Sequence, residues 1–139
     1  MKTSLIYGIF DFLHSGHIRL FEFAKKKSDY LIVALEGDKI NKVKSFNTEI
    51  KRQKEIKKLG IVDKCIIYNI SLDKLIKKVN PDFVIKGKEF ENSYNPEFKI
   101  INDVKSELIF NSGETLVYSD NLKPDNIDLG NISLNEDKS

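Results

Sequence analysis

The two histidines of this chain, His14 and His17, lie three positions apart with Gly16 between them. The apolar run 5–7 before them is typical of the end of a buried strand, and apolar residues at helical spacing follow from Ile18. If a helix begins near Ser15, Ser15 caps it, and the free backbone N–H groups and the positive end of the helix dipole lie beside both imidazoles. This arrangement predicts a phosphate site.

Two other interpretations of the histidine pair stay open. The pair could bind zinc with Asp11 as a third ligand, but no fourth ligand is apparent, and Gly16 with a helix start suits phosphate better. We therefore predict no metal-ligating residues. A purely structural role is more typical of lone histidines on an apolar face, whereas these two share one loop beside a glycine.

The elements that must position this pair alternate along the chain. Strand-like and helical patterns follow one another, with strands at 4–7, 30–35, 65–68, 83–85 and 108–110 and helices at 15–27, 48–59, 71–79 and 95–104. Such alternation predicts an α/β fold, a Rossmann-like, doubly wound, five-stranded and mainly parallel sheet with flanking helices. Ligands bind such sheets outside the carboxyl ends of the strands, which is where the histidine pair falls.

Further polar residues are expected at the same edge of the sheet. The loop from Lys39 to Asn47 contains Lys42 and Lys44, and it either closes over a polyphosphate or is an ordinary polar loop. Arg52 comes early in the next helix, so its side chain could point back towards this edge. After the fourth strand, the run 86–90 could bring backbone at Gly87 and charge at Lys86 and Lys88 to a ligand.

The chain beyond residue 118 differs in character from the rest. Ser112-Gly113-Glu114 predicts a turn into a short last strand at 116–118, and residues 119–139 are polar with little apolar periodicity. We predict one domain over 1–118 and a weakly structured tail or linker over 119–139.

Composition narrows the class of protein. The 139 residues are 40% hydrophobic, enough for one domain with a real core. A formal net charge of +2 does not suggest nucleic acid as a partner, and no apolar run approaches the roughly 20 residues that a membrane span needs. The single cysteine, Cys65, lies in an apolar run and suits a core position, so a cytoplasmic protein is expected.

Two runs carry a resemblance to known families. Residues 7–17, Tyr-Gly-Ile-Phe-Asp-Phe-Leu-His-Ser-Gly-His, resemble the signature of the HxGH nucleotidyltransferase superfamily, in particular the glycerol-3-phosphate, phosphocholine and phosphoethanolamine cytidylyltransferases. Residues 81–90 are more similar to the adenylyltransferase domain of ADP-heptose synthases. With weaker similarity between them, the resemblance covers about residues 3–118.

The resemblance implies a reaction and a set of site residues. It implies an enzyme that moves CMP, or less favourably AMP, from a nucleoside triphosphate with Mg²⁺ to a small phosphorylated alcohol, sugar or acid, with release of pyrophosphate. It assigns catalysis to His14, His17, Lys44 and Arg52. It assigns nucleotide binding to Tyr7, Gly8, Ile9, Phe10, Asp11, His14, Gly16, His17, Lys86, Gly87, Glu89 and Ser119. A homodimer is also expected from the family.

One segment departs from the family pattern. Close relatives have an arginine followed by a Gly-Ile-Ser-Thr-type helix start after the last strand, whereas this chain has Val-Tyr-Ser-Asp-Asn-Leu at 117–122. Ser119 can stand for the serine, but Asp120 adds negative charge and Pro124 suits only a first helical turn. Two alternatives therefore remain: a catalytically weakened nucleotide-binding or regulatory module, and the N-terminal domain of a larger bifunctional enzyme.

Overall fold

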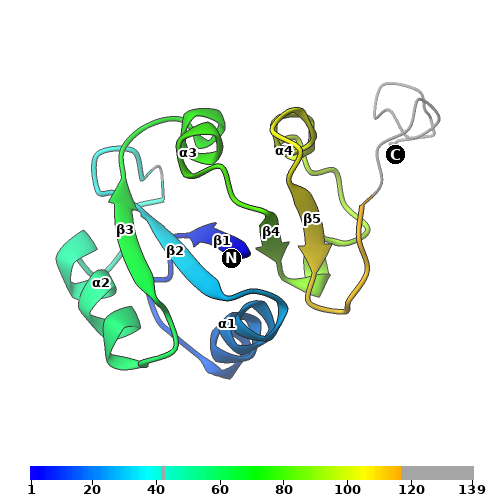
Figure 1. Cartoon of the computed structure of the whole chain (residues 1–139). Helices are drawn as coiled ribbons and strands as arrows, with labels where there is room; N and C mark the ends of the chain where they lie inside the picture. Colours follow the sequence, from blue (N-terminus) through cyan, green and yellow to red (C-terminus); the bar gives the residue numbers. More distant parts are fainter. Residues whose placement is uncertain (42, 117–139) are drawn as a thin grey trace.

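Five parallel strands form one sheet in the order β3-β2-β1-β4-β5 (Figure 1). The computed structural model describes residues 1–41 and 43–116. The strands are β1 (Thr3–Gly8), β2 (Tyr30–Glu36), β3 (Lys64–Tyr68), β4 (Phe83–Lys86) and β5 (Glu107–Phe110). This is the Rossmann-like, doubly wound sheet that the alternation of patterns predicted.

The helices cover both faces of this sheet. Helices α1 (Ser15–Lys27) and α2 (Glu49–Lys58) lie on one face, and α3 (Leu72–Val79) and α4 (Phe98–Asp103) lie on the other (Figure 1). Because β1 pairs with both β2 and β4, the winding of the chain reverses between β1 and β4. The crevice outside the carboxyl ends of these two strands is the place where such sheets bind ligands.

Each face of the sheet has its own apolar core. Phe21 of α1 and Ile56 of α2 pack with the inward residues of one face, and Ile76 of α3 and Ile101 of α4 pack with those of the other. All four side chains are fully buried. Burying a large apolar side chain stabilises a fold by roughly 1.5–3 kcal/mol, so these contacts hold the helices and their N-termini in place.

The segment between β4 and β5 differs from the predicted helix over 95–104. A short 3-10 helix, η1 (Lys88–Phe90), follows β4, and α4 begins only at Phe98. The side-chain amide of Asn95 donates to the carbonyl oxygens of Phe90 and Ser93, at 3.1 and 3.0 Å. An asparagine that bonds to nearby backbone in this way favours a turn over a helix, which explains the late start of α4.

After β5 the chain turns back on itself. Gly113 adopts a φ of 96°, Thr115 forms an antiparallel bridge with Ile109, and the amide of Leu116 donates to the carbonyl of Leu108 at 3.1 Å. The rest of the predicted last strand, Val117 and Tyr118, lies outside the described residues, so the domain boundary at 118 stays a prediction. Among the described residues, none of the helices is both long and apolar enough to span a bilayer.

Candidate functional site

His14 is the residue that caps α1, not Ser15 as the sequence suggested. His14 has extended backbone (φ −137°, ψ 176°), and its Nδ1 accepts a hydrogen bond from the amide of Gly16 at 3.0 Å. In return, Nδ1 of His17 accepts from the amide of His14 at 3.3 Å. The two histidines thus form a reciprocal capping box, a device worth about 1 kcal/mol to a helix.

This capping geometry sets the tautomer of both rings. An imidazole nitrogen that accepts a backbone N–H carries no proton, so each neutral ring holds its proton on Nε2. The rings stack with their centroids 3.8 Å apart at an angle of 25°. The Nε2–H groups of His14 and His17 are therefore two neighbouring hydrogen-bond donors at the positive end of α1.

The surroundings of His17 favour its neutral form. Desolvation and the neighbouring His14 hold the pKa of His17 below its usual value, and the carboxylate of Glu89 opposes them in part. At neutral pH, His17 can therefore donate from Nε2 without the cost of a buried charge.

Two glycines leave room for this arrangement. A Cβ on Gly16 would lie 2.8 Å from Cε1 of His14, and a Cβ on Gly8 would lie 3.1 Å from the ring of Phe10. Phe10 itself has a φ of 50°, and its ring packs edge-on against His17 and Phe21, with centroids 5.1 and 5.4 Å apart. The turn after β1 thus wedges Phe10 between the buried side of α1 and His17.

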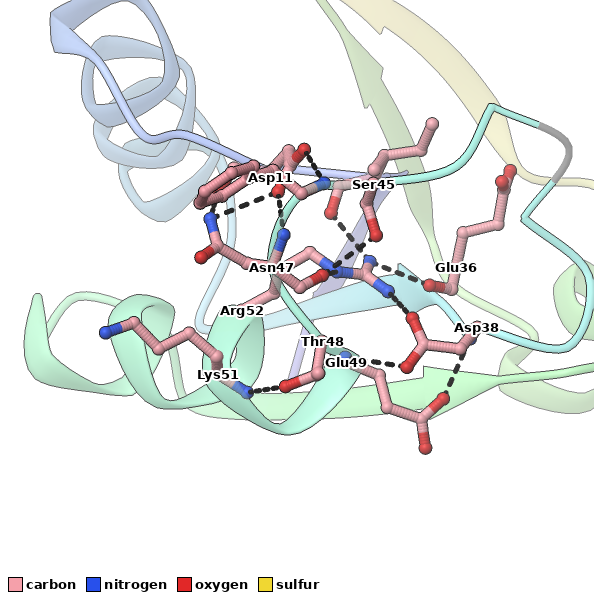
Figure 2. Close-up of polar contacts among 11 residues, drawn as sticks. Asp11, Glu36, Asp38, Ser45, Asn47, Thr48, Glu49, Lys51 and Arg52 are labelled. Carbon is pink, nitrogen blue, oxygen red and sulfur yellow. Dashed lines mark hydrogen bonds and ion pairs between the residues drawn. The ribbon is translucent and has the colours of Figure 1, made fainter.

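Asp11 fastens the loop before α2 to this turn. Its Oδ2 accepts from the amide of Phe46 at 2.6 Å, and its Oδ1 accepts from the amide of Asn47 at 2.9 Å (Figure 2). The side chain of Asn47 donates back to the carbonyl of Asp11 at 2.8 Å. Although desolvation opposes it, these hydrogen bonds hold the pKa of Asp11 below its usual value. Asp11 therefore acts as an anionic anchor for the loop that contains Lys44.

Arg52 lies beneath the same loop and is almost completely buried (Figure 2). Its Nη1 donates to the carbonyls of Ile9 and Glu36, at 2.9 and 2.8 Å, and its Nε donates to the carbonyl of Asn47 at 3.1 Å. Its Nη2 forms an ion pair with Asp38 at 2.8 Å. Arg52 thus joins the segments that follow β1 and β2 to the start of α2, which is a positioning role. Its predicted role as a charge partner for a phosphate stays a prediction.

The two predicted lysines follow different strands, Lys44 in the loop after β2 and Lys86 at the end of β4. Lys44 is exposed in the loop that Asp11 holds. Lys86, at the end of β4, is largely buried: its Nζ donates to Oδ1 of Asn95 at 2.6 Å and pairs with Oε2 of Glu97 at 2.7 Å. Lys86 therefore has a carboxylate partner within the protein, whereas Lys44 extends from an exposed loop.

The remaining predicted residues of β1 and β4 line the crevice between the two strands. Gly87 is buried, and the carboxylate of Glu89 folds back so closely that a Cβ on Gly87 would overlap it. The hydroxyl of Tyr7 donates to Oε2 of Glu97 at 2.6 Å, and burial together with the charge of Glu97 raises the pKa of Tyr7. Ser119 lies outside the described residues.

The family assignment comes from comparison with known proteins. Residues 5–124 match the family model described as cytidylyltransferase-like. The chain belongs to the cytidylyltransferase-like family. This confirms the resemblance seen at residues 7–17 and makes the protein a nucleotidyltransferase-type enzyme.

Several curated relatives support this assignment. The glycerol-3-phosphate cytidylyltransferase of Staphylococcus aureus is 33% identical over 79% of this chain and 83% of its own length. The FAD synthase of Ferroglobus placidus is 33% identical over 78% of this chain and 75% of its own length. The bifunctional protein HldE of Desulfatibacillum aliphaticivorans is 34% identical over 77% of this chain, which spans only 22% of that protein.

A solved structure supports the fold. A lipopolysaccharide core biosynthesis protein from Thermoplasma volcanium superposes with a TM-score of 0.68 over 86% of this chain and 99% of its own, at 24% sequence identity. The likeness confirms the Rossmann-like sheet of this cytidylyltransferase-like chain.

Two residues of the crevice were missed by the sequence interpretation. Asn95 and Glu97 are buried, 4% and 7% exposed, and both hold Lys86. They were placed inside a predicted helix, where a glutamate normally faces water. The dipeptide Asn95-Pro96 is a signal that could have indicated a turn here, because asparagine followed by proline favours the start of a turn.

Proposed function

We propose that this protein transfers CMP from CTP to a small phosphorylated alcohol, sugar or acid and releases pyrophosphate. An acceptor phosphate oxygen attacks the α-phosphorus in line and forms the new P–O bond. The bond from the α-phosphorus to the bridging oxygen breaks, and its electron pair leaves with pyrophosphate. Because the acceptor phosphate is already ionised, the reaction requires no general base.

The observation that carries this proposal is the stacked pair of His14 and His17 at the N-terminus of α1. Their Nε2–H groups are neighbouring donors at the start of the helix that follows β1, and we propose that they stabilise the negative charge that grows on the equatorial and leaving oxygens. Nothing in this chemistry needs a covalent intermediate. A Mg²⁺ ion bound to the triphosphate would supply further neutralisation of the phosphate charge, with substrate phosphate oxygens and water among its ligands.

The two sides of the crevice suit different parts of the substrates. Lys44 and the exposed loop that Asp11 holds are proposed to lie against phosphate, because Asp11 fastens this positively charged loop to the turn that precedes the histidine pair. Gly87 and Glu89, beyond the end of β4, are proposed to lie against the nucleoside. Arg52 is proposed to act on phosphates only through the loop that it supports.

CTP is proposed as the donor because the glycerol-3-phosphate cytidylyltransferase relative matches over most of both chains. ATP is the alternative, since HldE relatives and an FAD synthase match at similar identity. A thermal-shift screen with Mg²⁺ and each of CTP, ATP, GTP and UTP separates the two, because a ligand that binds the native state raises its melting temperature.

The main test is turnover. The protein is incubated with Mg²⁺, each nucleoside triphosphate and a panel of phosphorylated alcohols, sugars and acids, and pyrophosphate is measured. We expect release with one pair, and a loss of at least about a hundredfold in His17→Ala, because that change removes a transition-state donor. Absence of pyrophosphate with every pair, from a folded sample, would refute the proposal.

One observation favours a second candidate. The departure at 117–122 removes the arginine that close relatives have there, which suits a nucleotide-binding module with weakened chemistry. Calorimetry that shows nucleotide binding, together with no product from any acceptor, would favour this candidate. A homodimer, a cytoplasmic location and a place within a longer bifunctional enzyme remain proposals from the family.

A further inference from the structure

A buried polar cluster joins the carboxyl ends of β1 and β4 on the side of the crevice away from the lysine-containing loop. One carboxylate oxygen, Oε2 of Glu97, accepts from the hydroxyl of Tyr7 at 2.6 Å and from Nζ of Lys86 at 2.7 Å. The side chains of Glu97 and Lys86 are only 7% and 14% exposed. Although desolvation opposes it, the hydrogen bonds from Lys86 and Tyr7 hold the pKa of Glu97 below its usual value.

The same lysine organises the segment between β4 and α4. Nζ of Lys86 also donates to Oδ1 of Asn95 and lies 4.5 Å from the centre of the Phe90 ring. It therefore contacts both ends of the turn formed by residues 90–95. Asn95 in turn donates to the carbonyls of Phe90 and Ser93. Glu97 is therefore the anion that pairs with Lys86, the lysine whose Nζ lies against the turn formed by residues 90–95.

This segment forms one side of the proposed catalytic crevice. Glu89 belongs to it, and its carboxylate is close enough to His17 to act on the charge of that imidazole. Gly87, at its start, is buried beneath the same carboxylate. A shift of the segment would therefore move groups that face the histidine pair, while the loop held by Asp11 and Arg52 would stay in place.

We infer that Glu97 is a positioning residue for nucleotide binding: it holds Lys86 inward and so sets the position of the 87–96 wall against which the nucleoside lies. The inference rests on the proposed function and adds to it a residue that lies outside the HxGH signature. Lys86 acts here as part of the framework, since its charge is matched by Glu97 within the protein, and the phosphates of the substrates are left to the opposite loop.

The decisive variant is Glu97→Gln, which keeps the shape and removes the charge. We expect KM for the nucleoside triphosphate to rise about tenfold, with KM for the phosphorylated acceptor and kcat within about twofold to threefold of wild type. Lys86→Met should likewise raise KM for the nucleoside triphosphate and leave the acceptor KM and kcat nearly unchanged. The double variant should be no more than about twofold worse than the worse single variant, because both changes break one interaction.

A matched control lies on α4 itself. Asp103→Asn breaks an ion pair with Lys99 on the same short helix. Both side chains of this pair are exposed, 53% for Asp103 and 84% for Lys99. This control should leave both KM values unchanged. Equal rises in both KM values of Glu97→Gln would show a merely structural role and would overturn the inference, as would a nucleotide KM within twofold of wild type.

Two further measurements keep this inference separate from the proposed function. If the wild-type protein shows no turnover with any substrate pair, the proposed function fails, but the Kd for CTP and for ATP from calorimetry still tests Glu97. Hydrogen exchange of the unliganded protein tests the wall directly: amides 88–95 should exchange faster in Glu97→Gln, and those of α1 should not. Unchanged nucleotide Kd values or unchanged exchange over 88–95 would refute the positioning role.

Discussion

Nη1 of Arg52 lies 2.9 Å from the carbonyl oxygen of Ile9, a residue 43 positions earlier in the chain, and 2.8 Å from that of Glu36. A single buried guanidinium thereby holds together the segments that follow β1 and β2. The other two nitrogens of the guanidinium donate to the carbonyl of Asn47 and to the carboxylate of Asp38, and a single ammonium nitrogen could not reach all four acceptors at once. This contact explains how the histidine turn and the lysine-containing loop keep their relative positions.

Removing the Arg52 fork should destabilise the protein. In Arg52→Lys, one ammonium nitrogen replaces three donor nitrogens, so some of the acceptors of Arg52 lose their donor, and we expect a loss of roughly 2–4 kcal/mol in the free energy of unfolding. Urea unfolding measures it. Lys51→Met is the control, since Lys51 is exposed on the adjacent position of α2 and points away from the cluster in Figure 2. Equal midpoints for Arg52→Lys and wild type would contradict this account.

Gly16→Ala should separate catalysis from stability. The added Cβ would lie 2.8 Å from Cε1 of His14, so that ring must move, while alanine is otherwise favourable in a helix. We expect turnover to fall about a hundredfold and the free energy of unfolding to change by less than about 1 kcal/mol. Ser15→Ala, at the neighbouring exposed position, should keep both properties. Normal turnover in Gly16→Ala would show that the ring position does not matter.

The pH dependence of stability should contain a contribution from His17. The folded pKa of His17 lies below the unfolded value of about 6.5. At pH values between the two, the unfolded state therefore binds more protons than the folded state. The contribution of neutral His17 is therefore present above the unfolded pKa and is lost as pH falls through the folded pKa. His17→Gln, which can keep the capping hydrogen bond, should flatten the decline in unfolding free energy between neutral and mildly acidic pH. Parallel declines in the two proteins would rule out this contribution.

Releasing Asp11 should expose the lysine-containing loop to protease. Asp11→Ala removes the acceptors for the amides of Phe46 and Asn47, so the backbone near Lys44 should open more often. We expect trypsin to cut after Lys44 several times faster than in wild type under native conditions, as followed by mass spectrometry. Asp29→Ala, which removes an exposed carboxylate that accepts from the amide of Lys2, is the control. Equal cutting rates after Lys44 in Asp11→Ala and wild type would argue against the anchor.

Local pattern was enough to predict most of the fold. The alternation of apolar runs with helical spacing predicted all five strands in sequence order, and the apolar run 5–7 with the helical spacing from Ile18 predicted the strand and helix on either side of the histidines. Local pattern was less successful at caps and turns. Ser15 was expected to cap α1, but His14 does so, because its extended backbone brings Nδ1 to the amide of Gly16. The predicted helix over 95–104 starts late because Asn95 closes a turn.

The sequence by itself determined the five strands, the place of the histidine pair at a helix start and the resemblance to the family, since each depends on residues close together in the chain. Only the tertiary structure decided the partners of the buried charges. Glu97 meets Tyr7 across 90 positions, and Arg52 meets Ile9 across 43. A buried charge must find its partner among groups that the crossovers bring together, and no local periodicity records which groups those are.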